Sequence, residues 1–103
     1  LKRRTKMVVK LVEVKENRGV TSGSQYTLRE VFINPQRVVS MSEEPRLATE
    51  LREGRMPEGM NEHQSFTRIV LDQGSGGSSM IVVGSPVMID QKLTEGHIRL
   101  LNG

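Results

Sequence analysis

Apolar residues recur at strand spacing in five short stretches of the chain, and this pattern predicts five β-strands. The stretches are residues 7–15, 26–34, 38–41, 66–72 and 79–83. The first is rich in valine, and its apolar side chains fall on both phases of the alternation. A strand of this kind lies at the centre of its sheet or is covered on its outer face as well.

The segments between these stretches carry the residues that typically join antiparallel strands. Residues 16–25 are polar and contain glycine and serine, which predicts the tip of a long hairpin. Residues 73–78, Gln-Gly-Ser-Gly-Gly-Ser, predict the loop of a second hairpin. Pro35 ends the strand 26–34, because proline removes a donor from the strand ladder.

Residues 42–65 form an excursion of different character between two strands. Pro45 suits the first turn of a helix and Gly54 suits its C-terminal end, with apolar residues between them at helical spacing. Residues 55–65 show no period and contain Pro57 and Gly59. We predict a two-turn helix followed by an irregular loop, and we expect this excursion to contact partners.

Residues 78–93 read as the closing unit of the domain: a buried strand that turns at Gly84 into a capped amphipathic helix. Ser85 is a natural N-cap, and Pro86 suits the first helical position. The helix is expected to present one apolar stripe, made of Met88, Ile89 and Leu93. Gly96 is expected to stop this helix, leaving 96–103 as a short C-terminal tail that adds an edge strand or packs on a neighbour.

These elements predict an α+β fold with a small antiparallel sheet of about five strands. We expect the sheet to be strongly curled or barrel-like, with a short mid-chain helix and a C-terminal covering helix. A single globular domain would span 7–95, after a basic tail at 1–6. The chain has only three aromatic residues, Tyr26, Phe32 and Phe66, so its core is thin and a homo-oligomer is expected.

The basic character of the chain is concentrated in its first residues. Four of the 15 lysines and arginines lie in 1–6, and the remainder carries 11 basic against 12 acidic side chains. The folded part is therefore close to neutral. We expect residues 1–6 to precede a natural start at Met7. No apolar run approaches the length of a membrane span and no signal-peptide pattern follows the basic residues, so a cytoplasmic protein with no membrane contact is expected.

The residue types that carry catalysis are sparse and lack the necessary spacing. The chain has no cysteine, and its two histidines, His63 and His97, are not placed with carboxylates at metal-ligand spacing. It also lacks the Gly-x-Ser-x-Gly pattern of a nucleophile elbow. We predict that the protein is not an enzyme and has no metal site and no cofactor.

Two weaker binding hypotheses remain. Lys10, Arg29, Arg37 and Arg68 fall in or beside strands and would bind nucleic acid if they shared one sheet face, although no stacking platform of aromatic residues accompanies them. The alternative to nucleic-acid binding is that these four cations are isolated and face solvent. Gly84 and Ser85 run from a strand into a helix and would bind an anion through free amides; the alternative is an ordinary cap. The glycine-serine run 74–78 lacks this strand-to-helix context and is read as a hairpin loop.

Three segments carry a resemblance to a known family. They are Val-Phe-Ile-Asn-Pro-Gln-Arg-Val-Val-Ser-Met at 31–41, Phe-Thr-Arg-Ile-Val-Leu at 66–71 and Ile-Val-Val-Gly-Ser-Pro-Val-Met-Ile-Asp-Gln-Lys-Leu at 81–93. The chain resembles a family of small accessory proteins of tailed cyanobacterial phages. It is more loosely similar to the small FlbD-type flagellar proteins, from which the 42–65 excursion departs. The resemblance implies an accessory role in the host cytoplasm and carries no activity with it.

The leading functional hypothesis is therefore a non-enzymatic phage accessory protein that acts by protein binding or self-assembly. Its partners would be further copies of itself or an unknown host or phage protein. The expected surfaces are the 42–65 excursion and the exposed sheet face. The alternative is a nucleic-acid-binding regulator that uses the strand-borne arginines and lysine.

Overall fold

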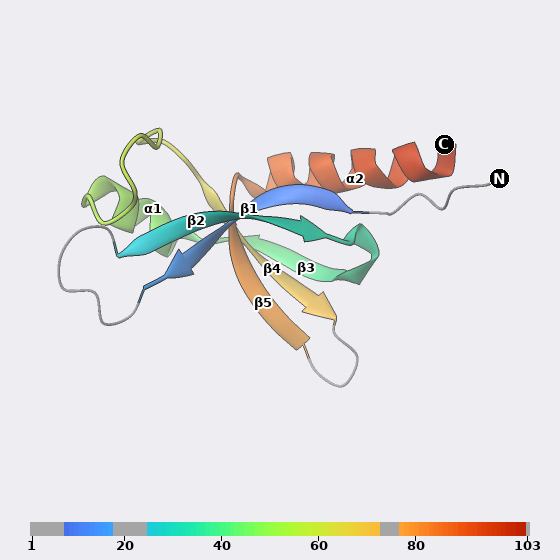
Figure 1. Ribbon diagram of the computed structural model, residues 1–103, viewed down its shortest axis with the longest axis horizontal. Coiled ribbons are helices and arrows are strands. Elements are labelled where there is room, and N and C mark those ends of the chain that lie inside the picture. Colours follow the sequence, from blue (N-terminus) through green and yellow to red (C-terminus); the bar gives the residue numbers. More distant parts are fainter. Residues whose placement is uncertain (1–7, 18–24, 73–76, 103) are drawn as a thin grey trace.

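The computed structural model describes residues 8–17, 25–72 and 77–102, the last seven of them by backbone alone. The chain forms an antiparallel sheet and two α-helices, which confirms the α+β class (Figure 1). In order, the elements are β1 (Val9–Glu16), β2 (Tyr26–Ile33), the short 3-10 helix η1 (Pro35–Arg37), β3 (Val38–Glu43), α1 (Pro45–Arg52), β4 (Phe66–Asp72), β5 (Gly77–Val83) and α2 (Pro86–Asn102). No helix in the described part of the chain is both long and apolar enough to cross a bilayer.

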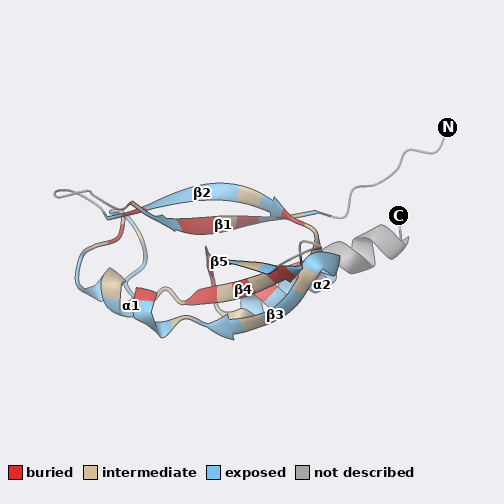
Figure 2. Cartoon of the chain, turned by 90° about the horizontal axis from the view of Figure 1, so that it is seen from below, coloured by how far each residue is buried: buried red, intermediate tan, exposed pale blue. Residues whose placement is uncertain are grey.

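The five strands lie in the order β2-β1-β5-β4-β3, and every neighbouring pair is antiparallel. Strands β2 and β3 are the two edges, and no ladder joins them in the described residues. The prediction of a strongly curled or barrel-like sheet is therefore not supported, since the sheet keeps two edges and a barrel has none. In Figure 2 the β1–β2 pair lies above the β3–β4 pair, with β5 between them.

The pairing register shows that each face of the sheet has its own hydrophobic core. Side chains on alternate residues of a strand point to opposite faces, and directly paired residues share a face. One face, which we call the α2 face, is covered by buried residues of α2 and of four strands: Leu11, Ile33, Ile69, Leu71, Val82, Ile89 and Leu93. The other, the α1 face, carries Val14, Tyr26 and Phe66 under Leu47 of α1 and Met56 of the following loop.

The two cores explain why the first strand has apolar side chains on both phases of its alternation. Strand β1 lies between β2 and β5, as the both-phase pattern predicted. Its Leu11 is buried in the core on the α2 face, whereas Val14 is buried in the core on the α1 face. Because the two helices cover opposite faces and opposite ends of the sheet (Figure 1), one strand needs apolar side chains on both phases.

Gly84 makes the connection from β5 into α2. Its φ is +126°, a backbone conformation that side chains with a Cβ rarely adopt. Its amide donates to the Ser65 carbonyl at 2.8 Å, and its carbonyl accepts from the Thr67 hydroxyl at 2.7 Å. A Cβ built on Gly84 would stand 3.0 Å from Cδ1 of Ile89, the fully buried residue by which α2 enters the core. The turn therefore sets the distance of α2 from the sheet.

Most predicted elements are confirmed within one or two residues. Strand β4 has the predicted bounds, and α1 begins at Pro45 and ends before Gly54, whose φ of +80° suits a residue that follows a helix. Ser85 caps α2, because its hydroxyl accepts from the Met88 amide at 3.3 Å. The segment 55–65 contains no helix or strand.

Two details of the C-terminal part were predicted wrongly, and the start of β5 differs from the prediction by two residues. Helix α2 continues through Gly96 to Asn102, so 96–102 is helix and not a tail or an edge strand. An interior glycine costs a helix only about 1 kcal/mol, which the residues on both sides offset. Met88 is 49% exposed and is not part of the buried stripe. Strand β5 begins at Gly77, inside the predicted hairpin loop, of which 73–76 lie outside the described residues.

We expect Gly84→Ala to lower the free energy of unfolding by about 3 kcal/mol or more, because it combines an unfavourable φ with a collision against Ile89. Gly54→Ala is the matched control: it has a positive φ but no atom near the added Cβ, and should cost about 1–2 kcal/mol. Urea denaturation measures both. Combining Gly84→Ala with Ile89→Val, which removes Cδ1, should cost less than the sum of the two single changes. Equal losses at 54 and 84 would contradict this account of the turn.

Candidate binding groove

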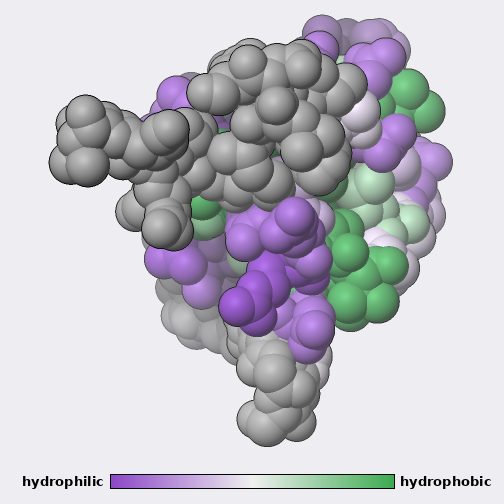
Figure 3. All heavy atoms as spheres, turned by 90° about the vertical axis from the view of Figure 1, so that its right-hand side faces the viewer, coloured by the Kyte–Doolittle hydropathy of each residue, from purple (hydrophilic) through white to green (hydrophobic). Residues whose placement is uncertain are grey.

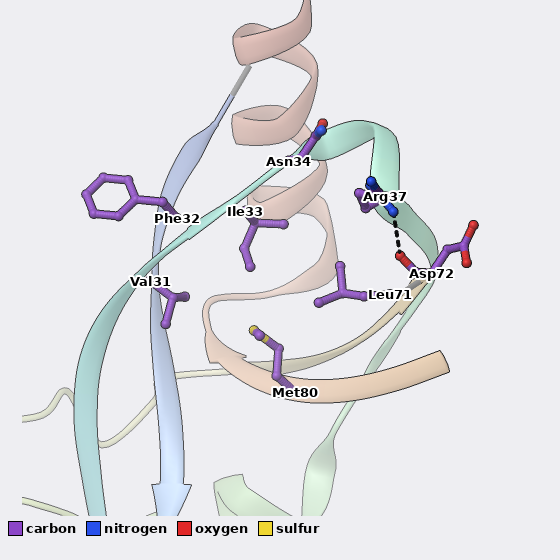
Figure 4. Close-up of a pocket in the computed structure, with 8 residues that line it drawn as sticks. All are labelled: Val31, Phe32, Ile33, Asn34, Arg37, Leu71, Asp72 and Met80. Carbon is purple, nitrogen blue, oxygen red and sulfur yellow. Dashed lines mark hydrogen bonds between the residues drawn. The ribbon is translucent and has the colours of Figure 1, made fainter. Parts of the chain in front are cut away.

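An open groove of about 630 Å³ lies where the end of β2 approaches the β4–β5 hairpin. It is lined by the end of β2 and the turn after it, by η1, by the end of β4 and by the middle of β5: Val31, Phe32, Ile33, Asn34, Arg37, Leu71, Asp72 and Met80. Figure 4 shows the side chains of Ile33, Leu71 and Met80 pointing into a common space, whereas the ring of Phe32 points away from it. The groove thus opens on the α2 face.

The groove exists because the two hairpins separate. Strands β1 and β2 pair over eight residues and β4 and β5 over seven, but β1 and β5 pair only at Glu13↔Val82 and Val14↔Ile81. Beyond this short ladder the hairpins diverge (Figure 1). Val31 and Met80 pack against the edge of the core and remain partly exposed on either side of the opening.

The chemistry of the groove is apolar at the floor and polar at the rim. Val31, Ile33, Leu71 and Met80 form the floor. At the rim, the Asn34 side chain accepts from the Gln36 amide at 2.9 Å and so shapes the turn. An Nη1 of Arg37 donates to the Asp72 carbonyl at 3.5 Å (Figure 4), a long contact that leaves the guanidinium exposed. Such a groove holds apolar groups and offers hydrogen bonds at its border.

Exposed apolar side chains occur outside the groove as well. The large ones are Val8, Leu28, Val39, Val87 and Met88; Phe32, which lines the groove, is exposed as well. On the side that Figure 3 presents, hydrophobic residues lie next to one another beside hydrophilic ones. Gathered apolar surface of this kind marks interaction sites more often than isolated residues do.

The four cations of the nucleic-acid hypothesis do not share a face. Arg29 pairs in register with Glu13 and therefore lies on the α2 face, whereas Lys10, three residues from Glu13 along β1, lies on the α1 face. Each has a carboxylate partner: Arg29 contacts Glu13 at 2.9 Å and Lys10 contacts Glu30 at 3.5 Å.

The other two cations are also separated. Arg68 lies on the α1 face, where its guanidinium contacts Glu44 at 2.8 Å and the Ser79 hydroxyl at 3.3 Å. Arg37 stands apart at the rim of the groove. The structure thus distributes the four residues over both faces and pairs three of them with acids.

The strand-to-helix turn uses the groups that an anion would need. The amide of Gly84 is bonded to Ser65, and the hydroxyl of Ser85 caps its own helix. Ser85 also accepts, through its carbonyl, from the Ile89 amide at 2.9 Å. These contacts match the capping alternative for Gly84 and Ser85.

Part of the 42–65 excursion packs against the sheet. Leu47 of α1 and Met56 of the loop are buried in the core on the α1 face. His63 is exposed on the loop, and the described residues contain no group of three or more potential ligands that would hold a metal ion. His97 lies among the residues whose side chains are not described.

A polar network between α1, the loop after it and the start of β2 was not visible in the sequence. The buried Tyr26 hydroxyl donates to Glu50 at 3.2 Å and accepts from Arg46 at 3.4 Å, and Arg55 bonds Glu50 at 2.8 Å. Burial raises the pKa of Tyr26 above its usual value near 10, against the opposing effect of the Arg46 hydrogen bond. Arg46 and Arg55 have raised pKa values, through hydrogen bonds to Tyr26 and Glu53 respectively. This network ties the excursion to the start of β2.

Comparison with known proteins adds no relative: no family model, no curated protein and no solved structure matches the chain. The resemblance to the cyanophage proteins therefore stays a prediction.

Replacing Arg29 should reveal a structural role. Arg29→Met keeps an apolar stem but leaves the carboxylate of Glu13, which is only 8% exposed, without this cation. We expect a loss of about 1–3 kcal/mol in the free energy of unfolding. Lys10→Met, which breaks the exposed pair with Glu30, should change it by less than about 0.5 kcal/mol. Urea denaturation compares the two, and adding Glu13→Gln to Arg29→Met should recover part of the loss. Equal effects of the two single changes would contradict the role assigned to Arg29.

Tyr26 should make stability fall at high pH. Above a pH of about 10 the unfolded state loses the phenol proton while the folded state, with its raised pKa, still binds it. The unfolded state then holds fewer protons, so the free energy of unfolding decreases as pH rises. Tyr26 is the only tyrosine, and ultraviolet absorbance therefore reports its ionisation directly. Tyr26→Phe should lack this component of the pH dependence, and an unshifted absorbance titration would disprove it.

Proposed function

We propose that this protein is a non-catalytic binding module that holds an apolar segment of another protein in the groove between β2 and the β4–β5 hairpin. The observation that carries the proposal is the groove itself. Its floor is aliphatic and thioether surface from three strands, and its polar groups are confined to the rim. The groups with shifted pKa values, Tyr26, Arg46 and Arg55, belong to the polar network that joins α1 and the loop after it to the start of β2.

The size of the groove suits a few side chains of a peptide. About 630 Å³ falls within the range of roughly 300–1,000 Å³ that is common for binding sites. Removing apolar surface from water contributes about 25 cal/mol per Å², so two or three seated side chains supply most of the affinity. Arg37 and Asn34 at the rim are placed to bond the backbone of the bound segment.

The resemblance to cyanophage proteins supplies the biological setting of the proposal. It supports an accessory protein that meets a host or phage partner in the host cytoplasm. The nucleic-acid alternative has less support, because its four cations lie on different faces and three contact carboxylates. The two functions also differ in salt response, since counterion release makes nucleic-acid affinity fall steeply with salt.

Selection of short random peptides on the immobilised protein tests the proposal. We expect the selected peptides to contain two or three apolar residues and to bind with an affinity that changes little with salt. Met80→Asp places a charge on the groove floor and should weaken binding at least about tenfold, measured by fluorescence anisotropy. Met80 is partly exposed, so this variant should still fold, which circular dichroism checks.

Met88→Asp is the matched control. Met88 is exposed on α2 and does not line the groove, so the same change there should leave peptide affinity unaltered. Binding that survives Met80→Asp, or that is lost equally in both variants, would refute the groove as the binding site. Tight, salt-sensitive binding of DNA by the wild type would favour the nucleic-acid alternative.

A further inference from the structure

The two edges of the sheet differ in how well they are protected from another strand. Strand β3 is six residues long and has a register irregularity between Val38 and Ser40, a device that discourages pairing. Strand β2 is eight residues long, contains no proline and pairs with β1 in unbroken register. In the described residues no strand occupies its outer side.

The charges on β2 do not protect this edge fully. Charged side chains on an edge strand normally discourage pairing, and β2 has two of them, Arg29 and Glu30. Each is already engaged within the sheet: Arg29 contacts Glu13 and Glu30 contacts Lys10, both on β1. The net charge presented along the edge is consequently small.

The exposed apolar residues of β2 are arranged symmetrically. Leu28 and Phe32 are 38% and 64% exposed, and both lie on the α1 face, beyond the part that α1 covers. Each is two residues from Glu30, which shares their face. An antiparallel strand of the same sequence, centred on Glu30, would therefore place its Phe32 opposite Leu28 and its Leu28 opposite Phe32.

We propose that β2 pairs with β2 of a second copy, antiparallel and centred on Glu30, to form a two-fold symmetric dimer. This pairing joins two five-stranded sheets into one continuous sheet. It buries two apolar cross-strand pairs, because a two-fold axis produces every contact twice. The ladder covers residues 27–33, nearly the whole of β2.

Neighbouring registers are less favourable. A two-fold axis normal to the sheet places each face of one copy beside the same face of the other. Directly opposite residues must then lie on the same face, and because faces alternate along a strand, the axis must pass beside a residue and not beside a peptide bond. Centring on Arg29 places two arginines opposite each other and Leu28 opposite Glu30. Centring on Val31 places Phe32 opposite Glu30. Only the register centred on Glu30 pairs Leu28 with Phe32 over almost the full strand.

That register places two Glu30 side chains opposite each other, and like charges so placed are unfavourable. Each copy brings Lys10 to its own Glu30 at 3.5 Å, so the central cluster contains two lysines and two glutamates. The residual repulsion predicts that Glu30→Gln tightens the dimer. The apolar pairs of this interface lie on the α1 face, whereas the groove opens on the α2 face, although residues 31–33 of β2 belong both to the ladder and to the groove lining. A monomeric protein would keep these groove residues in place, so failure of the dimer would leave the proposed function intact.

Disulfide trapping tests the register directly. The chain has no cysteine, so a single introduced cysteine forms only intermolecular disulfides. In the proposed dimer the two residues 30 are directly opposite, within the Cα separation of about 4.4–6.8 Å that a disulfide requires. Glu30→Cys should therefore give a covalent dimer under mild oxidation. Thr27→Cys is the control, since the two residues 27 lie six positions out of register and should not cross-link.

Sedimentation equilibrium provides the second measurement. Leu28→Ser should weaken dimerisation about tenfold, because it removes two cross-strand pairs, and Glu30→Gln should tighten it about fivefold. Met80→Asp, in the groove, should leave it unchanged. A wild type that is monomeric at all accessible concentrations would overturn the proposal, as would cross-linking at position 27 and not at 30. If Glu30→Cys fails to fold, the Leu28→Ser and wild-type sedimentation data decide the question.

Discussion

The short ladder between β1 and β5 is the constraint on which the rest of the structure depends. Two residue pairs, Glu13↔Val82 and Val14↔Ile81, are the connection within the sheet between the β1–β2 hairpin and the three-stranded β5–β4–β3 part. Because adjacent residues of a strand face opposite sides, these pairs belong to both cores. Val82 is buried under α2, whereas Val14 is buried on the side of α1. The β1–β5 ladder contains few hydrogen bonds, and side-chain packing on both faces of the sheet stabilises it.

The open groove and the unpaired edge of β2 both follow from this short β1–β5 ladder. Because the hairpins diverge beyond it, the core on the α2 face does not close, and Val31 and Met80 border an open groove. Because β1 is the only strand that pairs with β2 in the described residues, β2 is left as an edge with Leu28 and Phe32 exposed. A closed barrel would have neither feature. The thin, aromatic-poor core thus coincides with incomplete closure and with apolar surface left for other chains.

The elements could be predicted because their signals are local. Alternation, the Pro35 break, the Pro45 and Ser85 starts and the glycine after α1 each depend on a few adjacent residues, and the structure has them where they were expected. The end of α2 was missed for the same reason: Gly96 looks like a stop, yet a continuing helix offsets the cost of one glycine. The exposed Met88 was missed because periodicity shows which residues are apolar but not how wide a stripe the sheet covers.

The sequence by itself determined the α+β class, the strands and helices in order, and the presence of apolar side chains on both phases of the first strand. Only the tertiary structure decided that the sheet stays open, that each face has its own core, and that Lys10 and Arg29 lie on opposite faces. The groove was likewise invisible, since its lining comes from separate segments between Val31 and Met80. The physical reason is range: backbone preferences act between neighbours along the chain, whereas register, closure and pairing of charges depend on which distant strands come together.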